Sequence, residues 1–425
     1  MRRVLWPLAT IALLIGGGLW IAGSGAQDTG DRCHDPLGCV VLPAGAPLPL
    51  GVIQSLSGKV AVLGTEQVRG LELALASRNG RLLGHPVELV VEDTGCRPEG
   101  GANAALRIVS DSQVVAIFGT TCSGDAAAAA QVMTEAGLSM ISGNNSAPYL
   151  TAIGGERAPK WQPGYFRTAP NEEHSGPAAA RYAYVSLNVR KAALIHDGDI
   201  YTRGLAEGFR REFERLGGTV VLFTAVDKGD ADMRPVLEAV AAAKADLLFF
   251  PLFQPEGNKV LLAARGMLPL AGVRLMSDGS LIEQSFIDAV GESARGMYFV
   301  GPTPPTPNAA LAALTENYLA KYGEMPPTTY FANAYDAAGI LFAAITRAAK
   351  ADGQGNTVIG RQALRDALAA TRDYPGVTER LTCDRFGDCA KPRFNVLRLD
   401  EPRAGVNGLL ANVVSTYAPE DDHAR

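Results

Sequence analysis

From Leu50 onward, short runs of β-forming residues alternate with amphipathic segments, and this alternation limits the fold more than any other feature of the chain. In the first half, the pattern predicts strands at 50–53, 87–91, 114–118 and 138–141, and helices at 66–77, 101–109 and 126–136. Strands that alternate with helices form a parallel sheet with helices packed on both faces. We therefore predict an α/β fold with a doubly wound, Rossmann-like sheet.

The alternation restarts near residue 177, and 425 residues are enough for two domains. The second series predicts helices at 177–185, 203–216, 233–243, 256–265 and 282–289, and strands at 191–196, 219–223, 246–250, 273–276 and 297–300. The proline-rich segment 301–307 then forms a stiff connector. Long helices follow at 309–322, 328–349 and 361–371, and 377–417 is β-rich. Two similar lobes are expected.

The domain boundaries follow from this order. We expect a first lobe from residues 48–164 and 302–376, because the connector returns the chain to it. The second lobe would comprise residues 165–301 and 377–418, and residues 419–425 would form a tail. Residues 27–47 are polar and irregular and are expected to form a leader before the first lobe.

The N-terminus resembles a targeting segment. Arg2 and Arg3 precede an apolar run that ends at Gly23, and the small residues Ser24-Gly25-Ala26 follow, as at a signal-peptidase site. The run is also long enough to span a bilayer if it is retained. Residues 1–26 are thus a signal peptide or a membrane anchor. Either way, the mature protein lies in the periplasm or on the extracellular face of the membrane.

The six cysteines favour disulfides, because the chain is exported and their number is even. Six cysteines permit 15 pairings. Proximity in the sequence favours Cys33–Cys39 and Cys383–Cys389, which leaves Cys96–Cys122. No metal site or cofactor is expected, because no cysteine pair has Cys-x-x-Cys spacing and the five histidines are scattered.

Ser123 is the leading candidate for a ligand contact. Cys96 and Cys122 each lie in a loop directly after a predicted strand, at the sheet edge where ligands bind. Ser123 follows the second cysteine and opens the helix predicted at 126–136, and helix N-termini bind carboxylates. A plain N-cap serine would fit the same pattern. Asp125 argues against an anion site, because it already places negative charge in the first turn.

Other loops at the same sheet edges hold further candidates. Asn144 and Ser146 follow the next predicted strand and offer donors and acceptors. In the second lobe, Tyr201 and Phe253 follow predicted strands and could close over a ligand, and Asp278 could pair with a ligand ammonium group. Each of these residues equally fits a structural role as a turn, cap or core residue.

Several functional classes lack support in the sequence. The net charge is −5 and no basic stripe is present, so nucleic acid is not an expected partner. No Gly-x-Ser-x-Gly motif, P-loop or Gly-x-Gly-x-x-Gly motif opens a helix. We therefore do not expect an enzyme, and a secreted hydrolase stays only as a remote alternative.

Several segments together carry a family resemblance. They are GVIQSLSG at 51–58, EDTGC at 92–96, GTTCS at 119–123, MISGNNSAP at 140–148, His196-Asp197 with Tyr201, GESA at 291–294 and LTCDRFGDC at 381–389. The chain from Leu48 to Tyr417 resembles the leucine/isoleucine/valine-binding proteins, the type I periplasmic binding proteins of branched-chain amino-acid ABC transporters. The resemblance implies two lobes joined by three crossovers that close around a ligand.

The resemblance also implies roles for individual residues. The cysteine pair near the cleft matches Cys96 and Cys122, and the carboxylate-binding serine matches Ser123. Asn144 matches the residue that offers a backbone carbonyl, and Ser146 matches the hydroxyl donor. The aromatic residue of the second lobe matches Tyr201.

Five positions depart from the family pattern. Leu63 stands at an aromatic position of the first loop, and Phe253 lacks the hydroxyl of another aromatic position. Asp278 is one residue out of register with the ammonium-binding acid, and Asn144 and Asn145 replace smaller apolar residues. A polar amino acid, an amide or another small solute therefore stays open as the ligand.

We expect a monomeric binding protein that captures an amino acid, branched-chain or related, and delivers it to the membrane permease of an ABC transporter. The alternative is an extracytoplasmic sensor for an amide or other small solute, without transport. In both cases the cleft would close as a two-state hinge.

Overall fold

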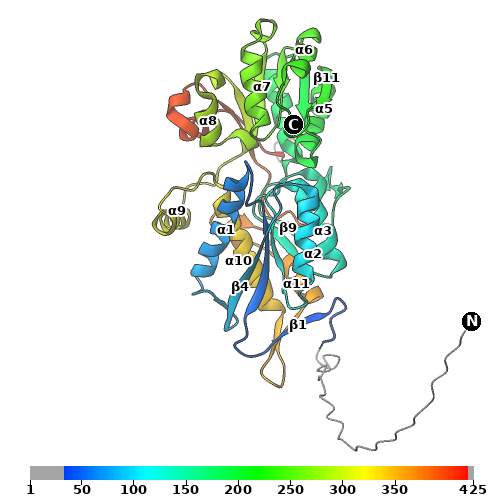
Figure 1. The fold of residues 1–425 in the computed structure, drawn as a ribbon, viewed down its shortest axis with the longest axis vertical. Helices are drawn as coiled ribbons and strands as arrows, with labels where there is room; N and C mark the ends of the chain where they lie inside the picture. The colour runs from blue at the N-terminus through cyan, green and yellow to red at the C-terminus, as the bar shows by residue number, and fades with distance from the viewer. Residues whose placement is uncertain (1–32, 420–425) are drawn as a thin grey trace, which may run out of the picture.

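The computed structural model describes residues 33–419. The predicted N-terminal signal peptide or anchor, and most of the predicted tail, lie outside the described residues. Between residues 33 and 419, no helix is both long enough and apolar enough to cross a membrane. The chain forms two lobes stacked along the long axis of the molecule (Figure 1).

The first lobe is built on a six-stranded sheet in the order β3-β4-β2-β5-β6-β9. The strands are β2 (Leu48–Gln54), β3 (Arg81–Leu82), β4 (His85–Asp93), β5 (Ile117–Gly119), β6 (Met140–Ser142) and β9 (Tyr165–Arg167). All neighbouring strands are parallel except β3, which pairs antiparallel with β4 at the edge. Every residue of β2 is buried, as expected for a strand covered on both faces.

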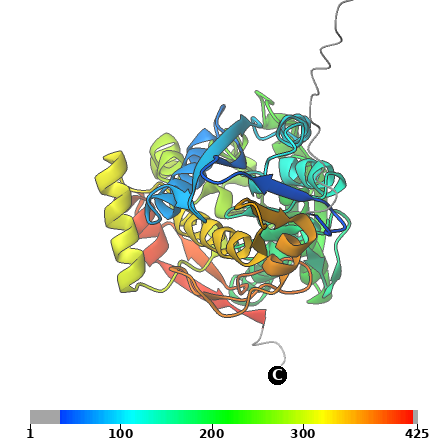
Figure 2. The same cartoon turned by 90° about the horizontal axis from the view of Figure 1, so that it is seen from below.

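Helices cover both faces of this sheet. On one face lie α1 (Ala61–Ala76), α10 (Tyr330–Ala348) and α11 (Arg361–Ala369), and on the other lie α2 (Pro98–Val109) and α3 (Ser123–Glu135). The helix α9 (Ala309–Tyr322) packs against α1 at the periphery, as the end-on view shows (Figure 2). The doubly wound arrangement predicted from the alternation is therefore observed.

The second lobe repeats this architecture with a seven-stranded sheet in the order β11-β10-β12-β13-β14-β19-β20. The strands are β10 (Lys191–His196), β11 (Thr219–Ala225), β12 (Leu247–Phe249), β13 (Arg274–Asp278), β14 (Tyr298–Pro302), β19 (Phe394–Arg398) and β20 (Val413–Tyr417). The last two strands are antiparallel. The helices of this lobe are α4 (Ser175–Arg181), α5 (Ile200–Arg215), α6 (Arg234–Ala242), α7 (Glu256–Arg265), α8 (Gln284–Val290) and α12 (Gly405–Ala411).

The strand order predicts which edge of each sheet faces a ligand. In chain order, the parallel strands of both sheets run 2-1-3-4-5, with the reversal between β2 and β5 in the first lobe and between β10 and β12 in the second. In open α/β sheets, ligands bind beyond the carboxyl ends of the strands at such a reversal. The loops after β5 and β12 are thus the positions where chemistry is expected.

The chain crosses between the lobes three times, at residues 168–174, 303–308 and 390–393. The first boundary differs from the prediction at 164–165, because β9 pairs with β6 and belongs to the first sheet. The last one differs too: the hairpin closed by Cys383–Cys389 lies in the first lobe, where Cys389 N–H donates to the Arg167 carbonyl. Its buried side chains join the first-lobe core, and a short β-rich pattern does not reveal which sheet it will join.

The described part of the predicted leader, residues 33–47, contains a strand, so the expectation of an irregular segment is wrong there. Residues Cys39–Leu42 form β1, which pairs antiparallel with β16 (Thr357–Gly360), and Val40 and Leu42 are buried in the first-lobe core. The structure contains the three predicted disulfides, Cys33–Cys39, Cys96–Cys122 and Cys383–Cys389.

Candidate ligand-binding site

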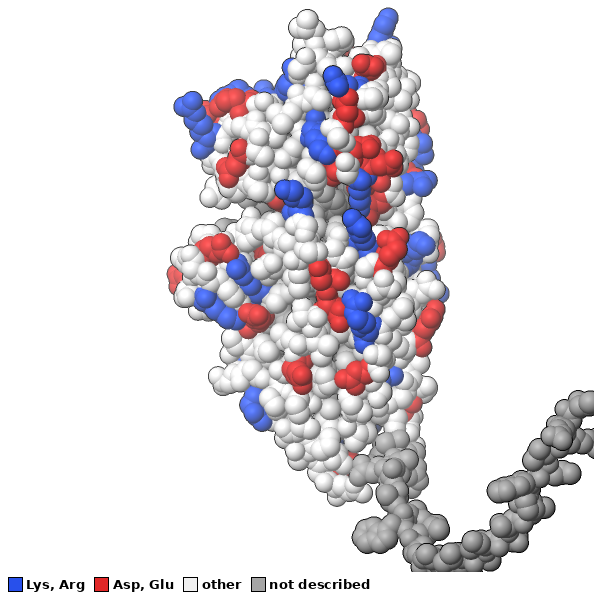
Figure 3. Space-filling model, in the orientation of Figure 1, with Lys and Arg blue, Asp and Glu red and all other residues white. Residues whose placement is uncertain are grey.

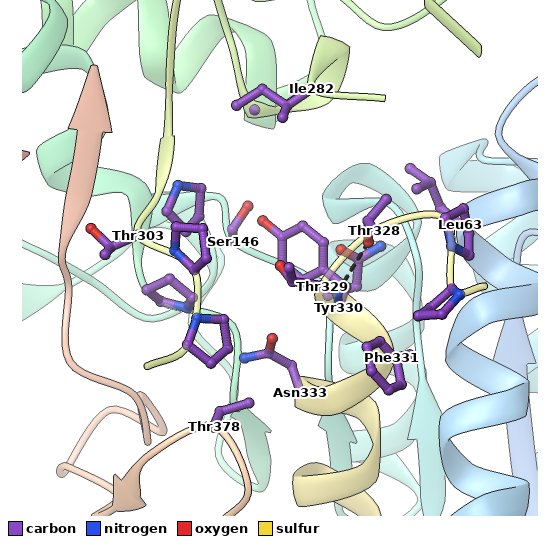
Figure 4. A pocket seen from close by; sticks show the side chains of 18 of the residues that line it. Leu63, Ser146, Ile282, Thr303, Thr328, Thr329, Tyr330, Phe331, Asn333 and Thr378 are labelled. Atoms are coloured by element: carbon purple, nitrogen blue, oxygen red, sulfur yellow. Dashed lines mark hydrogen bonds between the residues drawn. The ribbon is translucent and has the colours of Figure 1, made fainter. Parts of the chain in front are cut away.

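A cavity of about 400 Å³ lies between the two lobes. Loops at the carboxyl ends of strands from both sheets line it, together with the starts of α1, α5 and α10 and the second and third crossovers. Ile282 of the second lobe faces Leu63, Thr328 and Tyr330 across the cavity, and Thr303 of the second crossover forms a side wall (Figure 4). A ligand in this position would touch both lobes.

The cavity collects most of the residues predicted from the sequence. Six of them line it, namely Leu63, Ser123, Asn144, Ser146, Tyr201 and Phe253. Asp278 does not line the cavity. It is buried behind Tyr201, whose hydroxyl donates a hydrogen bond to its carboxylate. Asp278 therefore reaches the cavity through Tyr201.

The first-lobe wall includes the start of α3. Cys122 has extended backbone dihedrals and directly precedes Ser123, the first residue of α3, and no side chain caps this helix. The disulfide to Cys96 ties this loop to the loop after β4. The Ser123 hydroxyl accepts a hydrogen bond from Ala147 N–H at 3.2 Å and so joins the loops after β5 and β6. Uncapped N–H groups at a helix start can receive a ligand oxygen.

The acidic Asp125 in the first turn does not oppose an anion there. Its carboxylate is buried and points inward, where it accepts a hydrogen bond from Thr120 Oγ1 at 2.6 Å and others from Thr94 and Ser55. Burial raises the pKa of Asp125 to about 7, although these hydroxyls lower it. The side chain is thus a structural anchor for the loop.

Buried hydrogen bonds also hold the loop after β6. Ser142 Oγ accepts from the backbone N–H groups of Asn144 and Asn145, both at 3.0 Å. The Asn145 side-chain oxygen accepts from Thr120 N–H at 3.1 Å, which joins this loop to the loop after β5. With the backbone held in this way, Asn144 and Ser146 are presented at the cavity wall.

The second-lobe wall is aromatic and acidic. The rings of Tyr201 and Phe253 lie 5.4 Å apart between centroids. Asp278 accepts a hydrogen bond from Ser280 Oγ at 2.7 Å in addition to that from Tyr201. Burial raises the pKa of Asp278 to about 6, while these two hydrogen bonds lower it. A cation close to Tyr201 would favour the ionised carboxylate.

Sequence reasoning missed two residues near this wall, Glu172 and Tyr330. Tyr330 opens α10 and lines the cavity. Glu172 belongs to a short 3₁₀ turn (Glu172–His174) on the first crossover and is only 1 % exposed. The polar run from Asn171 to His174 is typical of a solvated helix start, so no sequence signal marked Glu172 as buried.

Neither the face shown in Figure 3 nor the metal-binding residue types of the described chain give a competing site. Lys and Arg side chains mix with Asp and Glu over the face shown in Figure 3, without a patch of one sign. Within residues 33–419, no group of three His, Cys, Asp or Glu side chains is placed to hold a metal ion. The cavity between the lobes is therefore the best-supported candidate site in the described part of the chain.

Comparison with known sequences gives consistent relatives. The family model for periplasmic binding proteins matches residues 47–390. The chain is 28 % identical over 359 residues to the Leu/Ile/Val-binding protein homolog 3 of Brucella melitensis, a match covering 84 % of this chain and 92 % of that protein. It is 26 % identical over 259 residues to the Leu/Ile/Val-binding protein of Escherichia coli K12, covering 60 % and 67 %.

Solved structures share the fold. The leucine-binding protein LivK of Thermotoga maritima superposes with a TM-score of 0.74 at 25 % identity, covering 88 % of this chain and 99 % of that one. LivJ of Streptococcus pneumoniae, solved with isoleucine, gives 0.70 at 25 % identity, covering 88 % and 99 %. A solute-binding protein of R. palustris, solved with benzoate, gives 0.70 at 22 % identity, covering 88 % and 98 %.

These findings confirm the predicted fold and resemblance. The relatives are solute-binding proteins and not enzymes, and the family is extracytoplasmic. The chain, with its two α/β lobes around one cavity, belongs to the periplasmic binding protein family as a solute-binding protein of the ABC-transporter type.

Proposed function

We propose that this protein binds an amino acid, branched-chain or closely related, between its lobes and delivers it to the permease of an ABC transporter. The observation that carries the proposal is the convergence of six predicted contact residues from both lobes on one cavity. The relatives named for binding leucine, isoleucine and valine, which match most of this chain, support the same ligand class.

Each end of an amino acid has a suitable partner. The ligand carboxylate would meet the hydroxyls of Ser123 and Ser146 and the uncapped N–H groups of α3. The ammonium group would meet the Asn144 carbonyl and the Tyr201 hydroxyl, with the negative charge of Asp278 behind it. Leu63 and Phe253 would contact the apolar side chain.

Closure would couple these contacts. Tyr201 and Phe253 belong to the second lobe, whereas Ser123, Asn144 and Ser146 belong to the first. A ligand favours the closed state only through contacts that differ between the two states, so it must touch both lobes at once. The closed monomer would then be the form that the permease recognises.

The experiment is a thermal-shift and calorimetry panel with leucine, isoleucine, valine, polar amino acids, amides, benzoate and 4-hydroxybenzoate. A ligand at about 100 times its dissociation constant should stabilise the protein by about 2.7 kcal/mol. A shift with benzoate or an amide and with no amino acid would overturn the amino-acid assignment. Loss of uptake of the identified ligand in a strain lacking this protein, restored by the wild type, would test delivery to the permease.

A further inference from the structure

Glu172 is buried without a hydrogen-bond partner beside the proposed site. Its side chain is 1 % exposed, and neither carboxyl oxygen makes a hydrogen bond of standard geometry with the residues described. Its backbone N–H donates to the Ser146 carbonyl at 3.0 Å, which holds the residue directly behind the cavity wall. Burial of an unpaired acid is costly, so such a residue calls for a functional explanation.

Other buried acids of the first lobe do not share this property. Asp125 accepts hydrogen bonds from three hydroxyls, as described above. Glu66 accepts from Thr328 N–H at 3.0 Å and from its hydroxyl at 2.7 Å. Asp336 accepts from Val377 N–H at 2.8 Å and Thr378 N–H at 3.0 Å. These acids hold loops together, whereas the Glu172 carboxyl group makes no hydrogen bond of standard geometry with the described residues.

The groups that face Glu172 come from five elements around the cavity. The hydroxyls of Ser146 and Tyr201 lie close enough to lower its pKa, and the charge of Asp278 on β13 raises it. Tyr330 on α10 feels the charges of both acids. Arg167 on β9 lowers the pKa of Glu172 but is already bound to Asp388 and to the Ala147 carbonyl. Two acids thus lie close to Tyr201, and the neighbouring Arg167 is already engaged by Asp388 and the Ala147 carbonyl.

We propose that Glu172 is a second anionic anchor which, together with Asp278 on the other side of Tyr201, selects ligands that carry an ammonium group over plain carboxylates such as benzoate. This inference rests on the proposed amino-acid function. An ammonium group at the Tyr201 hydroxyl would supply the positive counter-charge that an ionised Glu172 carboxylate lacks without ligand. A benzoate in the same place brings no cation, so Glu172 would stay protonated and would contribute no attraction to it.

The proposal predicts that ligand binding releases a proton from Glu172, which can be measured. In the empty protein, burial and Asp278 raise the pKa of Glu172 to about 8, so this carboxyl holds a proton at pH 7. An ammonium group nearby favours the ionised form and expels that proton. Binding of leucine should therefore release up to about one proton at pH 7, and affinity should rise with pH between about 6 and 8. Asp278, with a pKa of about 6, would contribute little to this release.

The test is titration calorimetry of the full chain with leucine, isoleucine and benzoate at pH 7, in buffers with different ionisation enthalpies. For the wild type, we expect a buffer-dependent enthalpy that reports proton release. Glu172→Gln should abolish the release and weaken leucine binding about tenfold or more, with a smaller effect on any benzoate binding. Asp278→Asn should weaken binding but keep the release. The matched control is Glu238→Gln, on the exposed face of α6.

The outcomes separate this proposal from the proposed function. If the wild type binds leucine without releasing a proton, or if Glu172→Gln binds it with unchanged affinity and release, the role of Glu172 is overturned and the amino-acid function stands. If the wild type binds benzoate and no amino acid, both are overturned. The wild-type measurement decides the question even if the Glu172→Gln variant does not fold.

Discussion

The two walls of the cleft are built differently. The first-lobe wall presents backbone N–H groups and small hydroxyl residues next to Leu63 and Tyr330, and all three disulfides lie in that lobe. The second-lobe wall presents Tyr201 and Phe253 in front of the buried Asp278, and residues 175–302 and 394–417 contain no cysteine. The first wall is thus covalently tied, and the second is held without a disulfide, by packing, hydrogen bonds and ion pairs such as that of Lys228 with Asp199.

This difference suggests a division of roles. A rigid wall of oriented donors can bind a carboxylate with little ordering cost, because its groups are already in place. Large aromatic side chains contribute most when they are brought down onto a ligand and desolvated. We infer that the first lobe receives the ligand and that the second lobe closes on it.

The variant with the largest expected effect lacks the Cys96–Cys122 disulfide, which lies next to the first-lobe wall. Replacing Cys96 and Cys122 by alanine should destabilise the protein by about 3–4 kcal/mol, because the bridge spans 26 residues of the unfolded chain. Urea unfolding followed by circular dichroism measures the loss. The matched control replaces Cys33 and Cys39, whose bridge spans 6 residues, and should cost about 2 kcal/mol. Equal losses would remove the special role of the Cys96–Cys122 bridge.

The next test removes one contact from each wall. Ser123→Ala should weaken ligand binding by about 1–3 kcal/mol, as expected for loss of a buried partner of a charged group. Tyr201→Phe should weaken it by a similar amount and should also reduce the ligand-induced compaction seen by small-angle scattering. Calorimetry gives both affinities, with Tyr184→Phe as a control away from the cleft. Full compaction of the Tyr201→Phe variant would contradict closure by the second lobe.

A third test concerns the pH dependence of the first wall. Burial raises the pKa of Asp125 to about 7, above the value of 3.8 for an exposed aspartate, so the folded state holds this proton more tightly than the unfolded chain does. The contribution of the protonated Asp125 to the free energy of unfolding is complete below pH 3.8 and is lost as the pH rises towards 7. Between pH 6 and pH 7 the loss is about 1 kcal/mol. Asp125→Asn should flatten the fall of Tm over this range, and an unchanged pH profile would contradict the inference.

The smallest effect is expected at the contact between the lobes beside the cleft. The Tyr149 hydroxyl of the first lobe donates a hydrogen bond to Glu207 on α5 of the second lobe at 2.5 Å. Because this pair is partly exposed, Tyr149→Phe should change ligand affinity by less than about 1 kcal/mol. A calorimetric change as large as that of Ser123→Ala would show that this contact, rather than the two walls, controls closure.

Much of the fold could be predicted from local patterns. The helix 309–322 coincides with α9, and the strands of both sheets other than β3 and β9 overlap their predicted ranges. The errors are at connections: β9 and the hairpin of Cys383 belong to the first lobe, and β1 lies within the predicted leader. These segments are short, so their partners are decided by distant residues rather than by their own pattern.

The candidate site was predictable where a residue follows a strand. Ser123, Asn144, Ser146, Tyr201 and Phe253 all do so, and the carboxyl edge of a parallel sheet gathers such positions. Glu172 and Tyr330 follow no such rule. Glu172 lies near the site because the first crossover runs next to the cavity, and Tyr330 lines it because α10 begins there.

By itself, the sequence determined the alternation of strands and helices, the cysteine pairs and the loops that line the cavity, because these depend on periodicity and spacing along the chain. Only the tertiary structure decided which lobe each short strand joins, that Asp278 lies behind Tyr201, and that the buried Glu172 carboxyl makes no hydrogen bond of standard geometry with the described residues. These features depend on the environment that distant segments create around a side chain, and burial and charge pairing are properties of that environment.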